Sequence, residues 1–389
     1  MTQLSRLAHL GLAKESVVGT YLAPTTFIPF TKADYEDLFT EIKDESIRAN
    51  DSVIQGLYQG VVEGDWGIDL MAYPDVVGHF LRGIIGPDTA SAGISTTVAA
   101  NSIVGATTLS STASISALSY ISVGTGASLE YAYVTAVSGV GPYSLTVTTV
   151  VGQAVGLVKA HTMTTDPIVS QTTHTFKQSP SAAKATYSLT VYDTSTGTPT
   201  LGYSGAAFSD VQFKIDPKGA VTLTTKLKSQ PGVSQSTPTP TYTVLPPVLG
   251  WQWAMTNAGG ASTRGLTFDL SVKRALEAIH ASSGLQAPRE IFQGALEASG
   301  TYKALFENLT DLNLFTNYTQ TPTTALLQQP AVIGGASLAL TLSQSGWFKG
   351  KRDLSSQYLQ ANFSIEGIYN ATDSGSVSAV LKNYVAAAY

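Results

Sequence analysis

Segments in which apolar and polar residues alternate recur along this chain of 389 residues. Alternation of period two places apolar side chains on one face of an extended strand and polar side chains on the other. The clearest such segments are residues 62–70, 186–193, 266–273, 337–342 and 360–369. Helical spacing is confined to short stretches, predicted at 34–39, 74–86 and 302–311. The pattern predicts a mainly β fold with few, short helices.

The composition indicates an ordered protein that does not bind nucleic acid strongly. Hydrophobic residues make up 43% of the chain and charged residues 13%, whereas about a quarter of the residues are charged in a typical soluble domain. Disordered chains have few hydrophobic and many charged residues, so this composition predicts a folded protein. The net charge is -5, so the chain lacks the basic excess that strong phosphate binding requires.

The residue types of most catalytic and metal sites are missing or scattered. The chain contains no cysteine, which excludes disulfides, thiolate metal ligands and cysteine nucleophiles. Its five histidines form no HxxxH pair, and it has neither a GxSxG motif nor a complete GxGxxG motif. We therefore expect no catalytic residue, no cofactor and no metal, and we expect that the protein is not an enzyme. No apolar run is long enough for a membrane helix, and the first residues lack the features of a signal peptide.

Residues 89–166 differ in composition from the rest of the chain. They consist mainly of Ser, Thr, Ala, Gly and Val, carry almost no charge, and form short strand-like runs separated by turn residues. Such a series of short strands is typical of a small β-barrel or sandwich. We therefore predict a small β domain at 89–166, inserted into a host domain that consists of residues 1–88 and 167–389.

Two groups of side chains are candidates for a site. Glu63, Asp65 and Asp69 lie at odd positions of one predicted strand and therefore share a face. A metal or glycosidase site would need partners that the sequence does not offer, which favours a solvated or lumen-facing strand. Trp251 and Trp253 are predicted on one strand face, where they either stack on a sugar or base or pack against protein.

Short motifs near both ends of the chain form an ordered series. On the N-terminal side they occupy residues 11–20, 23–29, 44–48, 64–68 and 73–75, followed by the predicted helix. On the C-terminal side they occupy residues 294–305 and 381–389. Their order and spacing resemble the tail tube proteins of tailed bacteriophages, over residues 1–88 and, more loosely, 167–389. The segment 89–166 resembles a small β module that recurs in phage virion proteins.

This resemblance implies a β-sandwich or split barrel with a flanking short helix. It implies hexameric rings whose strands join into one inner β-barrel, and stacking of these rings into the tail tube through which the genome passes. The implied partners are further copies of the chain, the tape measure protein, the tail terminator and tail-tip proteins, and genomic DNA that is not bound specifically. The implied location is the virion tail, after assembly in the host cytoplasm and without a membrane, with the inserted domain on the outer surface.

The resemblance also gives roles to charged residues. An acidic or neutral wall lets DNA slide without sticking, so Glu63, Asp65, Asp69 and Glu297 are the candidates for facing the lumen. The most charged segment, residues 32–60, is either a solvated loop or an assembly surface. If it is an assembly surface, ring stacking involves a loop whose candidate residues are Lys43, Asp44, Glu45 and Arg48.

Two alternative functions stay open at this point. The first is another virion component, such as a decoration protein or the inner tube of a contractile system. The second is a secreted or surface adhesin-like, carbohydrate-binding β protein that uses Trp251 and Trp253.

Overall fold

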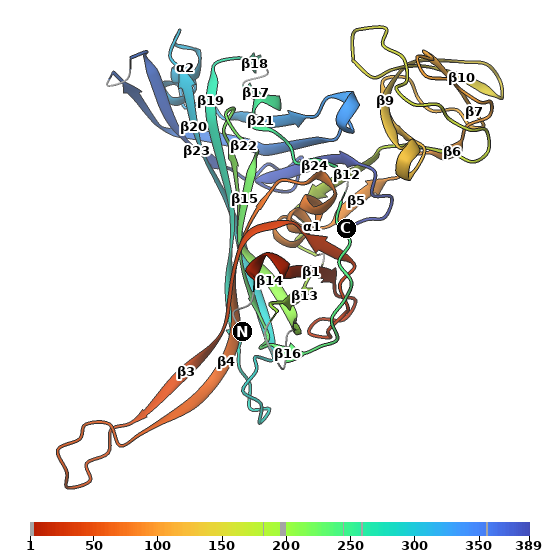
Figure 1. Ribbon diagram of the computed structural model, residues 1–389. Helices are drawn as coiled ribbons and strands as arrows, with labels where there is room; N and C mark the ends of the chain where they lie inside the picture. The colour runs from red at the N-terminus through yellow and green to blue at the C-terminus, as the bar shows by residue number, and fades with distance from the viewer. Residues whose placement is uncertain (1–3, 182, 195–199, 244, 258–259, 355–356) are drawn as a thin grey trace.

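The protein is mainly β and consists of a large sheet, a small sheet and two α-helices within the described residues (Figure 1). The computed structural model describes residues 4–389, except 182, 195–199, 244, 258–259 and 355–356. Short 3-10 turns add Ser5–Leu7, Gly126–Ser128, Gly250–Gln252 and Ala331–Ile333. No described helix is long and apolar enough to cross a membrane.

Long antiparallel strands form the first layer of the large sheet. Every neighbouring pair in this layer is antiparallel, as the residue registers show. In spatial order the strands are β3 (Phe30–Asp44), β4 (Gly56–Met71), β15 (Thr222–Ser229), β14 (Thr200–Ile215), β19 (Gly265–Ile279), β20 (Glu290–Leu305), β23 (Gln360–Gly367) and β22 (Ser337–Asp353). The alternation predicted from the sequence is thus realised as long strands with one buried face.

Two of these strands, β14 and β22, continue into a second layer, which gives the sheet a sandwich-like, half-barrel form. The first half of β22 pairs with β21 and β24, and the first half of β14 pairs with β13. The other strands of this layer pair outward from these. The second-layer strands are β1 (His9–Lys14), β2 (Thr26–Ile28), β5 (Asp88–Ser91), β12 (Thr172–Lys177), β13 (Tyr187–Tyr192), β16 (Val233–Ser234), β17 (Trp253–Asn257), β18 (Gly260–Ser262), β21 (Thr321–Gln328) and β24 (Val377–Asn383).

Helix α1 (Pro74–Ile84) packs between the two layers. Proline suits the first helical position because its missing N–H has no partner there, and the apolar stripe of the helix is fully buried. The Phe80 ring meets the Phe208 ring of β14 with centroids 5.4 Å apart. Gly83 permits this approach, because a Cβ atom there would lie 2.1 Å from the Phe208 ring. The helix predicted at 74–86 is confirmed.

The sequence prediction is wrong at two other helices. Residues 34–39 belong to strand β3, where register pairing with β4 and the packing of Tyr35 on Trp66 decide the conformation. The helix predicted at 302–311 is also displaced: β20 continues to Leu305 because Tyr302 is buried between β19 and β23, and α2 spans Thr310–Thr316. In both places tertiary pairing overrides a local pattern.

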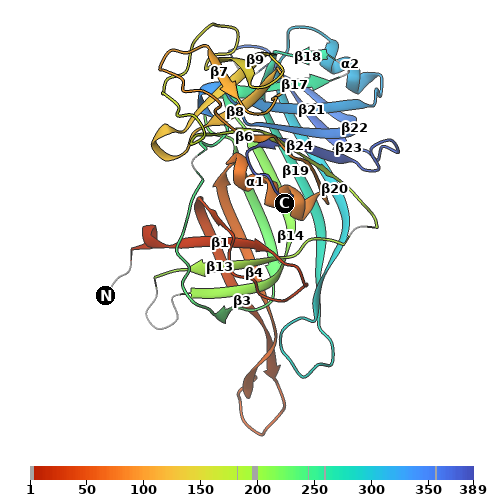
Figure 2. The same ribbon diagram turned by 90° about the vertical axis from the view of Figure 1, so that its right-hand side faces the viewer.

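The small sheet has a core of its own. Its strands, in spatial order, are β6 (Ser95–Thr97), β11 (Pro167–Ser170), β8 (Ser119–Val123), β9 (Glu130–Ser138), β10 (Tyr143–Thr148) and β7 (Thr108–Ser111). A separate hydrophobic cluster, including Leu109, Val134 and Leu145, lies inside it. The small sheet, α1 and the second layer lie on the same side of the long strands (Figures 1 and 2).

Candidate channel and assembly surfaces

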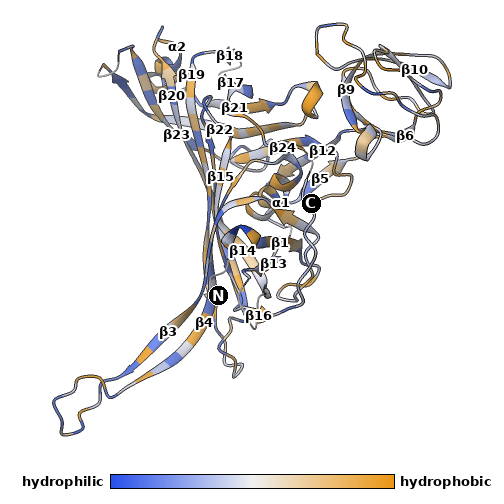
Figure 3. Ribbon diagram, in the orientation of Figure 1, coloured by the Kyte–Doolittle hydropathy of each residue, from blue (hydrophilic) through white to orange (hydrophobic). Residues whose placement is uncertain are grey.

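The long strands have one apolar and one polar face. Trp66, Phe213, Leu270, Tyr302 and Phe363 point to the core and are nearly fully buried. The residues between them point to the opposite face, and the alternation is visible along β3 and β4 in Figure 3. Cross-strand partners share a face, and the registers place the four lumen candidates on this polar face. These are Glu63, Asp65, Asp69 and Glu297.

A ladder of charges of alternating sign crosses the polar face. Lys226 lies opposite Asp210, Asp210 lies opposite Lys273, and Lys273 lies opposite Glu297. Lys228, a strand neighbour on the same face, forms an ion pair with Glu63. Opposite charges at cross-strand positions stabilise a sheet by roughly 0.2–1 kcal/mol a pair. The ladder therefore neutralises much of the charge within the face itself.

The charges are nearly balanced in total but unevenly placed. In the central part of this face, short of the projecting β3–β4 hairpin and of the β19–β20 loop, the carboxylates are Asp34, Glu36, Glu63, Asp65, Asp69, Asp210, Asp269, Glu297, Asp353 and Glu366. The lysines are Lys32, Lys214, Lys226, Lys228, Lys273, Lys303, Lys349 and Lys351. Carboxylates predominate on β3 and β4, at one lateral edge of the layer. Lysines predominate near β22, at the other edge.

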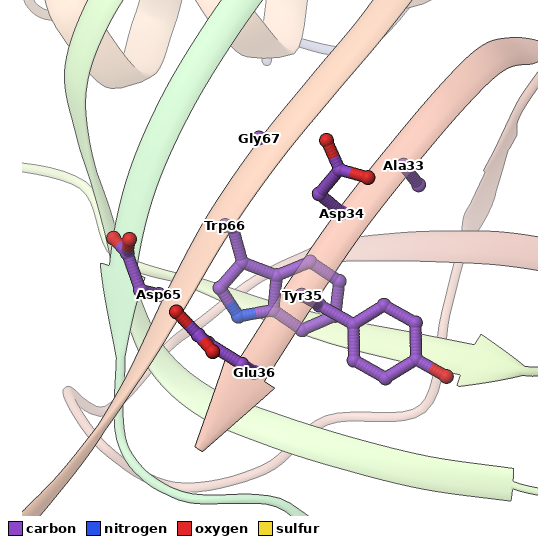
Figure 4. Close-up of a pocket in the computed structure, with 7 residues that line it drawn as sticks. All are labelled: Ala33, Asp34, Tyr35, Glu36, Asp65, Trp66 and Gly67. Atoms are coloured by element: carbon purple, nitrogen blue, oxygen red, sulfur yellow. The ribbon is translucent and has the colours of Figure 1, made fainter. Parts of the chain in front are cut away.

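A shallow acidic hollow lies on the β3–β4 edge (Figure 4). Asp34, Glu36 and Asp65 surround Gly67, and the volume of the hollow is about 420 Å³. The hollow exists because a Cβ atom at Gly67 would meet nothing within 4 Å. Beneath it the rings of Tyr35 and Trp66 stack with centroids 5.1 Å apart.

Burial gives the Tyr35 hydroxyl an unusual titration. Desolvation, followed by a hydrogen bond to Asp193, raises the pKa of Tyr35 to about 12. The phenol therefore stays neutral under physiological conditions and donates to Asp193 at 2.9 Å. The floor of the acidic hollow is thus uncharged, and its charge comes from the three carboxylates.

A basic hollow lies on the opposite edge. It has a volume of about 460 Å³ and is lined by Lys303, Lys349 and Lys351, together with neutral polar side chains such as Asn362 and Ser364. Sequence reasoning missed this group because β20 and β22 supply its lysines from distant segments. The sequence signal that could have found it is the spacing of Lys349 and Lys351, which are two residues apart and therefore share one face of a strand.

The β3–β4 hairpin extends well beyond the rest of the molecule (Figure 1). Gln286 of the β19–β20 loop supports its base, because the Gln286 carbonyl accepts from the Val62 amide at 3.0 Å. Exposed apolar side chains line the projecting part, which is unusual for a surface without a partner. They are Leu38, Phe39, Ile42, Ile47, Val53, Ile54, Leu57 and Tyr58.

The ring-stacking candidates lie at the tip of this hairpin. Lys43 and Asp44 end β3, and Glu45 and Arg48 lie in the loop that follows. Asp44 pairs with Arg48 and accepts hydrogen bonds from Ser46 and Arg48, and the Ser46 bonds lower the pKa of this carboxyl. The tip is thus an ordered turn that carries both charges and apolar side chains.

The small sheet holds its charges inside. His161 Nε2 lies 2.6 Å from Glu130 Oε1, and His161 Nδ1 lies 3.3 Å from Asp166 Oδ2. All three residues are buried. A hydrogen bond from the Thr162 amide is the main cause that lowers the pKa of Asp166. Lys159 is the only other Asp, Glu, Lys or Arg of residues 95–170, so the surface of this sheet is almost uncharged.

The two tryptophans do not form a platform. Trp251 lies in the 3-10 turn Gly250–Gln252 and is 61% exposed, whereas Trp253 begins β17 and stacks on Phe268 in the core. The prediction that they share a strand face is therefore wrong, because the chain turns between them. Across the part of the chain that the structure describes, no group of three or more His, Asp and Glu side chains is arranged to hold a metal ion.

Comparison with known proteins gives a family match over most of the chain. The phage tail tube protein family matches the chain over residues 5–367, which is nearly its whole length. No curated protein matches it significantly. The family match spans the small sheet, the hairpin, α1, α2 and the strands of the large sheet other than β24. The chain therefore belongs to the phage tail tube protein family and is a structural protein of the phage tail.

Proposed function

We propose that six copies of this chain form a ring, that rings stack into the tail tube, and that the genome passes along the polar face of the long strands. The observation that carries this proposal is the shape and charge of the long sheet. Its apolar face is covered by α1 and the second layer, its polar face is uncovered, and its charges are nearly balanced. A concave wall with these properties suits a channel.

The direction of the strands supports ring closure. β3 pairs only with β4, and residues 346–353 of β22 pair only with β23, among the strands described. Each neighbouring pair from β3 to β22 is antiparallel, so β3 and β22 run in opposite directions. A copy rotated about the tube axis then places its β3 antiparallel to the β22 of its neighbour, and ring closure covers both edges.

The charge ladder supports passage without binding. DNA is held when lysines and arginines are free to replace its counterions. Here Lys273 lies between Asp210 and Glu297 of the two neighbouring strands, and Lys226 lies opposite Asp210. The wall therefore offers the phosphates little net attraction. The function is mechanical and electrostatic, with no catalytic residue and no cofactor.

The hairpin is the proposed contact between rings. Its charged tip residues Lys43, Asp44, Glu45 and Arg48 and its exposed apolar side chains reach beyond the body of the subunit. A head-to-tail contact of this kind repeats without closing and yields a filament. The two unlike ends of such a tube would meet the tail terminator and the tail-tip proteins, and the channel would hold the tape measure protein before the DNA. Assembly takes place in the host cytoplasm.

The small sheet is proposed to decorate the tube. It overlaps the inserted domain expected at 89–166, although β5 belongs to the large sheet and β11 to the small sheet. It lies on the side of the long strands opposite to the polar face. If the polar face lines the channel, this domain lies on the outer surface.

The test is electron microscopy of the purified protein in negative stain at several concentrations. We expect rings or hollow tubes with a central channel, and projections on their outer surface. Removal of residues 95–170, with a short glycine linker from 94 to 171, should remove the projections and keep the channel. Monomers at every concentration, even after addition of assembled tail tips as nuclei, would contradict the proposal.

A further inference from the structure

We infer that neighbouring subunits recognise each other by charge: Asp34 and Glu36 on the β3 edge of one copy bind Lys349 and Lys351 on the β22 edge of a second copy. This inference rests on the proposed ring and adds the chemistry of its subunit contact. Both groups lie on the polar face, at the two lateral edges of the same layer.

The acidic edge is only partly compensated in the single subunit, where Lys32 pairs with Asp34 and Lys228 lies opposite Asp65. Glu36 and Asp65 occupy directly opposite positions on β3 and β4, and like charges at such positions destabilise a sheet. Neither forms an ion pair within the described chain, because the nearby Lys228 pairs with Glu63 and Lys32 pairs with Asp34. The side chain missing at Gly67 leaves room between these carboxylates. A lysine side chain from a second copy would fit into this space.

The basic edge carries lysines that lack ion-pair partners in the described residues. Lys303, Lys349 and Lys351 line one hollow, and the other side chains there are uncharged. For these three lysines, too, the described residues provide no ion pair. The lysines of β22 border an edge whose backbone has no further strand partner beyond residue 345 in the described chain.

The pairing of unlike edges also selects the type of assembly. A β3 edge against another β3 edge would bring carboxylates together, and two β22 edges would bring lysines together. Such contacts oppose two-fold dimers of either edge. Only the contact of β3 with β22 relieves both clusters, and it is heterologous, as a ring requires. The contact should weaken as salt is added, because these charges are partly exposed.

Charge reversal gives a sharp test. One variant carries Asp34→Lys and Glu36→Lys, so that both of its edges are basic. The other carries Lys349→Glu and Lys351→Glu, so that both of its edges are acidic. We expect each variant alone to form rings only at a protein concentration at least about tenfold higher than the unchanged chain requires. Mixed in equal amounts, they should form rings in which the two variants alternate.

The readouts are sedimentation velocity and negative-stain microscopy, with mass spectrometry of the rings to give the ratio of the two variants. Lys218→Glu, in the exposed β14–β15 turn, is the matched control and should assemble normally. Circular dichroism tests whether each variant is folded. A charge-reversed variant that does not fold is replaced by its neutral counterpart, which is Asp34→Asn with Glu36→Gln or Lys349→Gln with Lys351→Gln. Each neutral pair alone should then raise the concentration needed for rings and reduce its salt dependence.

The outcomes separate the two proposals. If the unchanged chain forms rings and either reversed variant assembles equally well alone, the charge contact is refuted while the ring stands. If each variant fails alone and the mixture also fails, the edges named here do not meet. If the unchanged chain forms no rings even on tail-tip nuclei, the proposed function itself fails.

Discussion

His79 illustrates how burial sets the chemistry of single residues in this fold. It lies on α1, in edge contact with the rings of Tyr187 and Tyr389, and its Nε2 lies 3.1 Å from the Thr26 hydroxyl. Desolvation, with a smaller contribution from Lys14, lowers the pKa of His79 to about 4. The imidazole is therefore neutral in the folded protein, and the unfolded chain takes up a proton more readily.

This difference predicts a loss of stability in mild acid. Between the ordinary value of about 6.5 and the folded value, the unfolded state binds more protons, so the free energy of unfolding falls as the pH falls. From pH 7 to pH 4.5 the unchanged protein should lose about 2–3 kcal/mol more than His79→Gln, which does not titrate. Urea unfolding of the unassembled subunit at both pH values measures this. Equal losses in the two proteins would refute it.

The buried group around His161 predicts local unfolding. His161→Phe leaves Glu130 and Asp166 buried without their shared partner, at a cost of about 3 kcal/mol. The core of the small sheet is separate from the main core, so the damage should stay there. Limited proteolysis with mass spectrometry should find new cuts within residues 95–170 and none in the long strands. Ser138→Ala, at the exposed end of β9, is the control, and cuts spread through both sheets would count against separate cores.

At the scale of elements, the alternation of apolar and polar residues predicted most long strands and the buried side of each. It did so because a half-buried strand needs this pattern whatever its partner. It failed at residues 34–39 and 302–311, where short segments fit either a helix or a strand until β4 or β23 pairs with them. The basic hollow could not be predicted from the sequence for the same reason, since only the strand register brings Lys303 close to Lys349.

The hairpin gives a prediction at this scale. Removal of residues 43–50 takes away the charged tip and Ile47, which is 99% exposed. The main core does not include the tip, so the subunit should keep its thermal stability and still form rings. Long tubes should no longer form, as counted by electron microscopy.

Single substitutions separate the apolar from the charged contribution of the tip. Ile47→Ser should shorten the tubes, whereas Val140→Ser, at a position 98% exposed on the β9–β10 turn, should leave their length unchanged. Normal tubes from the deletion variant would assign ring stacking to another surface.

At the scale of the whole molecule, the polar face rather than the net charge decides how the tube treats DNA. A net charge of -5 describes all surfaces together. The wall that faces DNA is set by the sheet register, which places carboxylates and lysines opposite each other on neighbouring strands. A chain with the same composition but shifted registers would lose this local balance.

This argument predicts that a basic wall slows the genome. Asp69→Lys with Glu297→Lys turns two wall positions from negative to positive in every subunit. It keeps Asp34, Glu36, Lys349 and Lys351 of the proposed contact unchanged, although Asp69 lies opposite Lys32 on β3. Tubes should assemble normally, but DNA ejection from phage particles carrying them should slow or stop, because free lysines bind phosphates. Added salt should restore ejection, and Asp69→Asn with Glu297→Gln should have a small effect. Unchanged ejection kinetics at low salt, followed by fluorescence of released DNA, would show that these residues do not face the channel.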